Sequence, residues 1–114
     1  MKEILVIRLS AIGDILLTTP VLQRLKKVFP DARITFLVKE RYAEFIAASP
    51  DVDRIETWKD GQSVWAVRGA LHAEIPRFDL VLDLQSNLKT RLLSLIMSAA
   101  EKRRYRKPYL HRIL

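Results

Sequence analysis

An aspartate near the amino terminus, Asp14, is the residue of this 114-residue chain whose type and position best suit chemistry. It follows Gly13 and comes shortly after the apolar run from Ile4 to Ile7, where a strand is expected to turn into a helix. A helix start favours an ionised carboxylate, and an ionised carboxylate can accept a proton from a hydroxyl group. Asp14 is therefore a candidate general base. Alternatively, Asp14 is only a structural charge that stabilises the start of the helix by up to about 1 kcal/mol. The spacing of the residues does not decide between these two interpretations.

A sheet must position this aspartate. The continuous apolar run before it is typical of a strand buried on both faces, and alternating strand and helix patterns predict a mostly parallel α/β sheet. Open sheets of this kind bind ligands beyond the carboxyl ends of their strands, where Asp14 would lie. The predicted strands are Glu3–Arg8, Arg33–Val38, Arg54–Trp58, Leu80–Leu84 and Arg103–Arg106, and the predicted helices span 21–29, 40–48, 61–74 and 87–100.

Pro20 leaves two alternatives for the first long helix. Either the helix begins at Asp14 and kinks, or Thr19 caps a helix that has Pro20 in its first turn. The preceding turn has a single glycine, whereas a dinucleotide site needs several for close approach of the pyrophosphate. Asp14 would also repel a phosphate. A dinucleotide or P-loop site is therefore not expected here.

The composition excludes several other classes of protein. There is no cysteine, so disulfides and thiolate metal sites are excluded. His72 and His111 are far apart and lack ligand spacing, which predicts no metal site. No signal peptide is recognisable, and the apolar stretch 92–100 is far shorter than the roughly 20 residues that span a bilayer. These features predict a cytoplasmic protein of one domain.

The net charge of +7 comes entirely from the last thirty residues. Residues 1–84 hold twelve basic and twelve acidic side chains, whereas residues 85–114 hold eight basic side chains against Glu101. The block 102–107 has three interpretations: a solvated strand edge, a patch for the anionic inner-membrane surface, or a phosphate contact to nucleic acid. No recognised nucleic-acid motif accompanies it, so a nucleic-acid partner is not expected. A standalone basic module binding RNA or acidic lipid, without catalysis, remains the alternative to an enzyme.

Four stretches of the chain carry a resemblance to a known family. The opening VIRLSAIGDILLTTPVL (6–22) resembles the first motif of the heptosyltransferases, glycosyltransferase family nine. The stretches 34–38, 79–90 and 102–106 resemble that family's second strand, a strand and turn ending in Gln, a small residue and a basic residue, and a following basic strand. Ser86 departs from the pattern, since many members have glycine there.

The resemblance implies a fold, a reaction and a set of partners. Residues 1–114 would be the acceptor-binding, Rossmann-like domain of a GT-B enzyme, with the donor-binding carboxy-terminal domain absent. Family members move a heptose from an ADP-activated donor to the lipopolysaccharide inner core with inversion, without a resident cofactor. Their proposed general base falls on Asp14 here. The isolated chain would then fold but be inactive.

Six further residues are candidates for binding the acceptor. Ser10 could orient it or merely close the turn, and Gly13 allows close backbone approach or a positive φ. Lys59, Arg68 and Lys89, with Arg91 beside them, lie near predicted strand ends or early helical turns and could hold phosphates or carboxylates. Each of these cations could equally be a solvated surface charge. Asp83 is expected to cap a turn, and Trp58 and Trp65 are expected to anchor the core or a domain interface.

Overall fold

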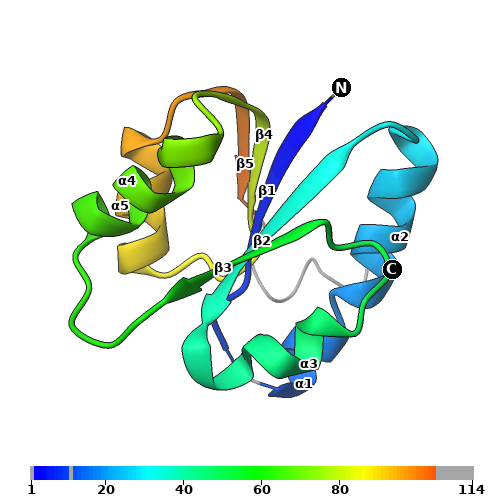
Figure 1. The fold of residues 1–114 in the computed structure, drawn as a ribbon, viewed down its shortest axis with the longest axis horizontal. Helices are drawn as coiled ribbons and strands as arrows, with labels where there is room; N and C mark the ends of the chain where they lie inside the picture. The colour runs from blue at the N-terminus through cyan, green and yellow to red at the C-terminus, as the bar shows by residue number, and fades with distance from the viewer. Residues whose placement is uncertain (1, 11, 105–114) are drawn as a thin grey trace.

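Five parallel strands pair in the order β3-β2-β1-β4-β5 in the computed structural model, which describes residues 2–10 and 12–104. Helices lie on both sides of the sheet, with α4 and α5 on one side and α1, α2 and α3 on the other (Figure 1). The strands are β1 Glu3–Ile7, β2 Arg33–Lys39, β3 Arg54–Trp58, β4 Phe78–Asp83 and β5 Ala99–Arg104. The helices are α1 Ile12–Leu16, α2 Thr19–Val28, α3 Ala43–Ala47, α4 Val64–Glu74 and α5 Leu88–Ile96, with a 3₁₀ turn η1 at Glu40–Tyr42.

The central strand β1 is buried on both faces, which confirms the expectation from its continuous apolar run. Ile4 and Val6 belong to the core under α1–α3, whereas Leu5 and Ile7 belong to the core under α4 and α5. All four side chains are fully buried. The Rossmann-like fold class is therefore confirmed, and its buried middle strand is the rigid element that carries the site.

The chain reverses its direction of travel across the sheet next to β1. From β1 it proceeds to β2 and β3 on one side, then crosses to β4 and β5 on the other. At the carboxyl end of β1, Ile7 pairs with Leu37 of β2 and with Asp83 of β4. Loops that leave two neighbouring strands in opposite directions open a crevice at such a point, where doubly wound sheets bind their ligands.

Pro20 lies in the first turn of α2, so a single kinked helix from Asp14 is wrong. The chain forms two helices, α1 and α2, separated by Leu17 and Thr18. The second alternative is correct about Pro20, although the N-cap position is Thr18 rather than Thr19. Proline has no backbone N–H to donate, and this does not destabilise the helix there, because the N–H groups of the first turn have no acceptor within the helix.

Two predicted boundaries near the carboxyl end are wrong. The helix expected over 87–100 ends at Ile96, and the strand expected at 103 begins at Ala99. Ala99 pairs with Phe78 in the sheet. Alanine favours a helix by intrinsic propensity, but here strand pairing outweighs that propensity. Residues 105 and 106 of the predicted strand lie outside the described residues.

The turn between β4 and α5 has a residue in the left-handed region. Ser86 has φ of 54°, a conformation that glycine adopts without steric cost. Its N–H donates to the Asp83 carboxylate at 2.8 Å, and Asn87 then caps α5 in a reciprocal capping box with Thr90. No helix within residues 2–10 and 12–104 is long and apolar enough to cross a membrane.

Candidate active site

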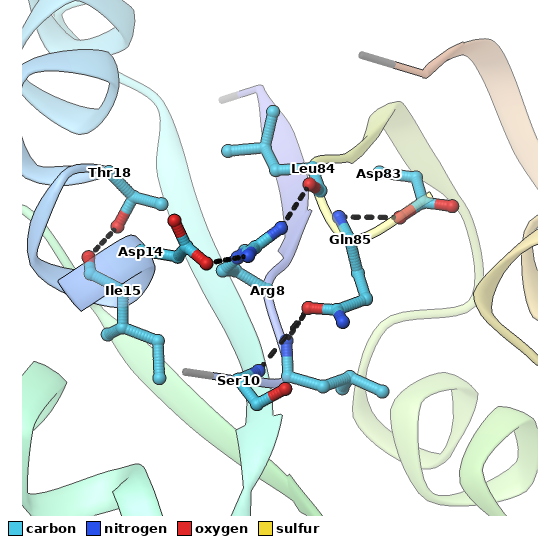
Figure 2. A network of polar contacts seen from close by, with 9 residues as sticks. Arg8, Ser10, Asp14, Ile15, Thr18, Asp83, Leu84 and Gln85 are labelled. Carbon is cyan, nitrogen blue, oxygen red and sulfur yellow. Dashed lines mark hydrogen bonds and ion pairs between the residues drawn. The ribbon is translucent and has the colours of Figure 1, made fainter. Parts of the chain in front are cut away.

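Asp14 is held by an arginine that follows the central strand. The Arg8 side chain forms an ion pair with Asp14, with 2.6 Å between Nη2 and Oδ2, and its Nη1 donates to the Leu84 carbonyl at 2.8 Å (Figure 2). The two side chains are only 7% and 16% exposed. A charge-assisted contact in such a sheltered place is stronger than a surface pair and fixes the carboxylate in one orientation.

Arg8 was not predicted from the sequence as a site residue. It lies at the end of an apolar strand, where a cation has no evident reason to be buried. Its two partners come from α1 and from the end of β4, which is 76 residues away in the chain. The only signal in the sequence was the charge of Arg8 itself, since a buried arginine needs a partner and Asp14 is the first acid that follows it in the chain.

Gln85 joins the loop after β1 to the loop after β4. Its side-chain oxygen Oε1 accepts from the backbone N–H groups of Leu9 and Ser10 at 3.1 and 3.3 Å (Figure 2). Its own N–H donates to Asp83 Oδ1 at 3.0 Å. The backbone of Ser10 therefore belongs to a bridged turn, in agreement with the structural alternative for that residue, and an acceptor role for its hydroxyl stays a prediction.

Of the two properties expected of Gly13, the structure excludes the positive φ and does not test close approach by a substrate. Gly13 has no positive φ, and a Cβ atom added to it would meet nothing within 4 Å. The reason is that Gly13 is the second residue of α1, and its carbonyl accepts from the N–H of Leu17. Its position beside Asp14 on an exposed surface leaves substrate binding there as a prediction.

Two of the four predicted cations, Lys59 and Lys89, lie near the carboxyl edge of the sheet, and Arg91 is exposed on α5. Lys59 follows β3 and is exposed, and Lys89 in the first turn of α5 places its ammonium 4.4 Å from the centre of the Trp58 ring. Arg68 differs, because its Nε donates to the carbonyl of Ile96 at 2.8 Å and so ties α4 to the end of α5. The structure thus gives Arg68 a structural contact and leaves Lys59 and Lys89 as candidate anion contacts.

The other predicted residues have mainly structural contacts. Trp58 is buried in the core as expected, whereas Trp65 is 67% exposed and anchors no core of the described chain. The two ring nitrogens of His72 contact the Ile75 carbonyl and the Ser98 N–H. Within the part of the chain that the structure describes, no three acidic or histidine side chains cluster as metal ligands would.

Asp83 caps the turn after β4, as expected. Its Oδ1 accepts from the N–H groups of Gln85 and Ser86, while its Oδ2 is buried without a partner among the described residues. Burial raises the pKa of this carboxyl, although the hydrogen bonds and the charge of Arg104 act in the opposite direction. The folded state therefore disfavours the ionised form of Asp83.

We expect this raised pKa to make folding less favourable as the pH rises. Because the pKa of Asp83 is higher in the folded chain than in the unfolded chain, the folded state binds more protons between these two pKa values. The free energy of unfolding therefore decreases as the pH rises from the unfolded pKa to the folded pKa. Asp83→Asn should remove that fall, measured by urea denaturation at a series of pH values from acidic to neutral.

Asp53 provides a control of opposite sign. Burial alone would raise its pKa, but Lys26 and the Ile34 N–H outweigh burial and lower it. The stabilising contribution of ionised Asp53 is therefore present above its unfolded pKa and is lost as the pH falls through its folded pKa. For this reason Asp53→Asn should reduce the free energy of unfolding near neutral pH. A lower stability of Asp83→Asn than of the unsubstituted chain near neutral pH would contradict the account of Asp83.

No protein-family model matches the chain, but curated proteins and solved structures resemble it over most of its length. The chain is 34% identical over 98 residues to lipopolysaccharide heptosyltransferase 1 of Campylobacter coli, an alignment covering 84% of this chain and 29% of that protein. It is 26% identical over 106 residues to the lipopolysaccharide core heptosyltransferase OpsX of Haemophilus influenzae, covering 89% and 29%. The chain thus spans less than a third of the length of these curated relatives.

Solved structures show the same fold. A glycosyl transferase family 9 protein from Veillonella parvula superposes with a TM-score of 0.84 at 26% identity, over 95% of this chain and 34% of that one. The Escherichia coli ADP-heptose lps heptosyltransferase II superposes with a TM-score of 0.79 over all of this chain and 33% of that one, and at 20% identity this likeness concerns the fold alone. The curated homologues of this chain are lipopolysaccharide heptosyltransferases, and the solved structures that share its fold include a glycosyl transferase family 9 protein, of which this chain spans about a third.

Proposed function

We propose that this chain is the acceptor-binding domain of an inverting, GT-B type heptosyltransferase in which Asp14 is the general base. Residues 1–114 form one incomplete Rossmann-like domain in this proposal, and a carboxy-terminal domain binds the nucleotide sugar. One observation carries it: a sheltered carboxylate, held by Arg8 beyond the carboxyl end of the central strand, in a homologue of heptosyltransferases.

The proposed reaction is a direct displacement at the anomeric carbon. Asp14 accepts the proton of an acceptor hydroxyl, the hydroxyl oxygen forms the new glycosidic bond, and the bond from the sugar to the diphosphate breaks so that ADP leaves. A single base suffices because no covalent intermediate is formed, and the transition state resembles an oxocarbenium ion by analogy with glycoside hydrolysis. No resident cofactor or metal takes part in this scheme.

The donor and acceptor are ADP-heptose and the lipopolysaccharide inner core in this proposal. Support comes from the names of the relatives and from an Escherichia coli heptosyltransferase solved with ADP-2-deoxy-2-fluoro heptose. Ser10, Gly13, Lys59 and Lys89 would contact the acceptor, while Arg68 would support α5. The enzyme would work in the cytoplasm, at the inner-membrane surface where its acceptor is anchored.

The proposal is tested by assaying the complete gene product with ADP-heptose and an inner-core acceptor. We expect acceptor-dependent release of ADP by the complete protein. We expect none by residues 1–114 alone, because in this proposal the residues that bind the donor lie in the carboxy-terminal domain. Absence of heptose transfer by the complete protein, or turnover by the 114 residues alone, would contradict it. The noncatalytic RNA or lipid module has no support among the relatives.

A further inference from the structure

The side-chain amide of Gln85 is fixed in one orientation. Its oxygen Oε1 lies 3.1 Å from the backbone nitrogen of Leu9 and 3.3 Å from that of Ser10. Both backbone groups are donors, and a carboxamide accepts only through its oxygen, because its nitrogen carries two N–H donors of its own. Exchanging the oxygen and the nitrogen would set the NH₂ group against two backbone donors. The Nε2 group therefore faces away from the backbone of the loop after β1.

The backbone of Gln85 is held as firmly as its side chain. Its N–H is shared between the Ile7 carbonyl at 3.1 Å and Asp83 Oδ1 at 3.0 Å. Ile7 is the last residue of the buried strand β1, and Asp83 is the last residue of β4. A side chain anchored at both ends loses little conformational freedom when a ligand reaches it, and such preorganisation makes a hydrogen bond effective in binding.

The Nε2 group of Gln85 has two N–H donors that the described part of the chain leaves unused. Within residues 2–10 and 12–104, its amide makes hydrogen bonds through Oε1 and none through Nε2. The Nε of Arg8 also lacks a partner among these residues, but it is buried, whereas Gln85 Nε2 is open to solvent. Gln85 therefore presents an oriented and accessible donor beside the turn at Ser10.

The charges near this donor favour an anionic ligand. Helix α5 begins three residues after Gln85, has Lys89 in its first turn and contains no acidic residue. Asp14 lies on the far side of Arg8 from Gln85 (Figure 2), and the carboxylate of Asp83 is buried, with 1% exposure. Hydrogen bonds to an ionised acceptor are roughly twice as strong as those between neutral groups. A carboxylate or phosphate oxygen therefore suits this donor better than a hydroxyl group does.

We propose that Gln85 is a substrate-binding residue whose Nε2 donates to a carboxylate or phosphate oxygen of the sugar acceptor. This inference rests on the proposed function, to which it adds a contact that determines specificity. In the proposed reaction Asp14 accepts the proton of the reacting hydroxyl, while Gln85 holds an anionic group of the acceptor at a distance from that hydroxyl. Acceptors without the anionic group then bind less tightly, although their reacting hydroxyl is unchanged.

Gln85→Glu in the complete enzyme separates the two roles of this side chain. A carboxylate keeps an oxygen for the N–H groups of Leu9 and Ser10, but it replaces the NH₂ donor by a second oxygen that repels an anion. We expect the KM for the acceptor to rise by at least about tenfold, because a hydrogen bond to a charged group is lost. The KM for ADP-heptose and the melting temperature should stay the same. Gln85→Met also removes the bridging oxygen and should therefore lower the melting temperature.

Gln23→Glu is the matched control. It makes the same change of group and charge at an exposed position of α2, and both KM values should stay unchanged. Two modified acceptors identify the anion, one treated with phosphatase and one with its carboxylates esterified. The acceptor that lacks the contacted group should abolish the difference between Gln85→Glu and the unsubstituted enzyme. A difference that persists with both modified acceptors would overturn the proposal.

Two further results would also overturn it. An unchanged acceptor KM in Gln85→Glu would leave Gln85 as a link between two loops and no more. A lower melting temperature of Gln85→Glu would show that Nε2 has a structural partner elsewhere in the complete protein. Failure of the unsubstituted complete protein to transfer heptose is distinguishable from these results, because it contradicts the proposed function itself and the contact of Gln85 with it.

Discussion

Asp14→Asn is expected to lower the turnover of the complete enzyme by at least about 100-fold, because loss of a general base typically costs 10²–10⁴ in rate. The asparagine retains an oxygen that can accept from Arg8, at the position where the Asp14 carboxylate now lies 2.6 Å from Nη2. The fold should therefore persist while the group that accepts the proton is lost. The measurement is the rate of ADP release at saturating acceptor, together with circular dichroism and a thermal melt of the variant.

Glu44→Gln is the matched control for this substitution. Glu44 is also an acid in the first turn of a short helix, α3, and it is exposed. Its loss removes a similar helix-terminal charge from α3 rather than from α1, and turnover should be unchanged. Near-normal turnover of Asp14→Asn, with Glu44→Gln equally active, would reject Asp14 as the base and leave it as a structural partner of Arg8.

Arg8→Met is expected to destabilise the chain by about 3–5 kcal/mol, since removing one partner of a buried pair leaves the other charge without compensation. The methionine fills a similar length but donates neither to Asp14 nor to the Leu84 carbonyl. Arg8→Lys should cost less, because a lysine keeps the charge but cannot reproduce the fork of the guanidinium. Urea denaturation of the 114-residue chain measures both.

A double-mutant cycle separates the ion pair from packing. If the cost arises from the uncompensated carboxylate, Arg8→Met should cost much less in a chain that already carries Asp14→Asn. Arg103→Met breaks the exposed pair with Glu101, whose side chains are 62% and 53% exposed, and should cost less than about 1 kcal/mol. Equal costs of Arg8→Met and Arg103→Met would show that the buried pair contributes no more than a surface one.

The central part of the fold could be predicted from the sequence because its signals are local. The apolar run from Ile4 to Ile7 indicates burial on both faces, and its four side chains divide between the two cores as a strand period of two requires. The carboxyl end was harder to predict. Ala99 and Ala100 suit a helix by propensity, and only their pairing with β4, which a local pattern does not contain, places them in a strand.

The site was predicted only in part for a similar reason. Asp14 could be put forward as a candidate because a glycine and an aspartate after a buried strand form a local pattern. Arg8 and Gln85 could not, since their contacts to Leu84, Leu9 and Ser10 join segments 75 or 76 residues apart. Trp65 was expected to be a core or interface anchor because of its type, and its exposed position follows from its place on the outer side of α4.

The links from Arg8 to the Leu84 carbonyl and from Gln85 to the Leu9 N–H have a consequence for the order of folding. During synthesis, β1, β2 and β3 can begin to pair while residues 84 and 85 are still inside the ribosome, but Arg8 then lacks its carbonyl partner and the turn at Leu9 lacks its bridge. Contacts of such long sequence separation form slowly because a large loop must close first. The nascent chain therefore completes the contacts that hold Arg8 and the turn at Leu9 only after most of these residues have been made, when β4 docks beside β1.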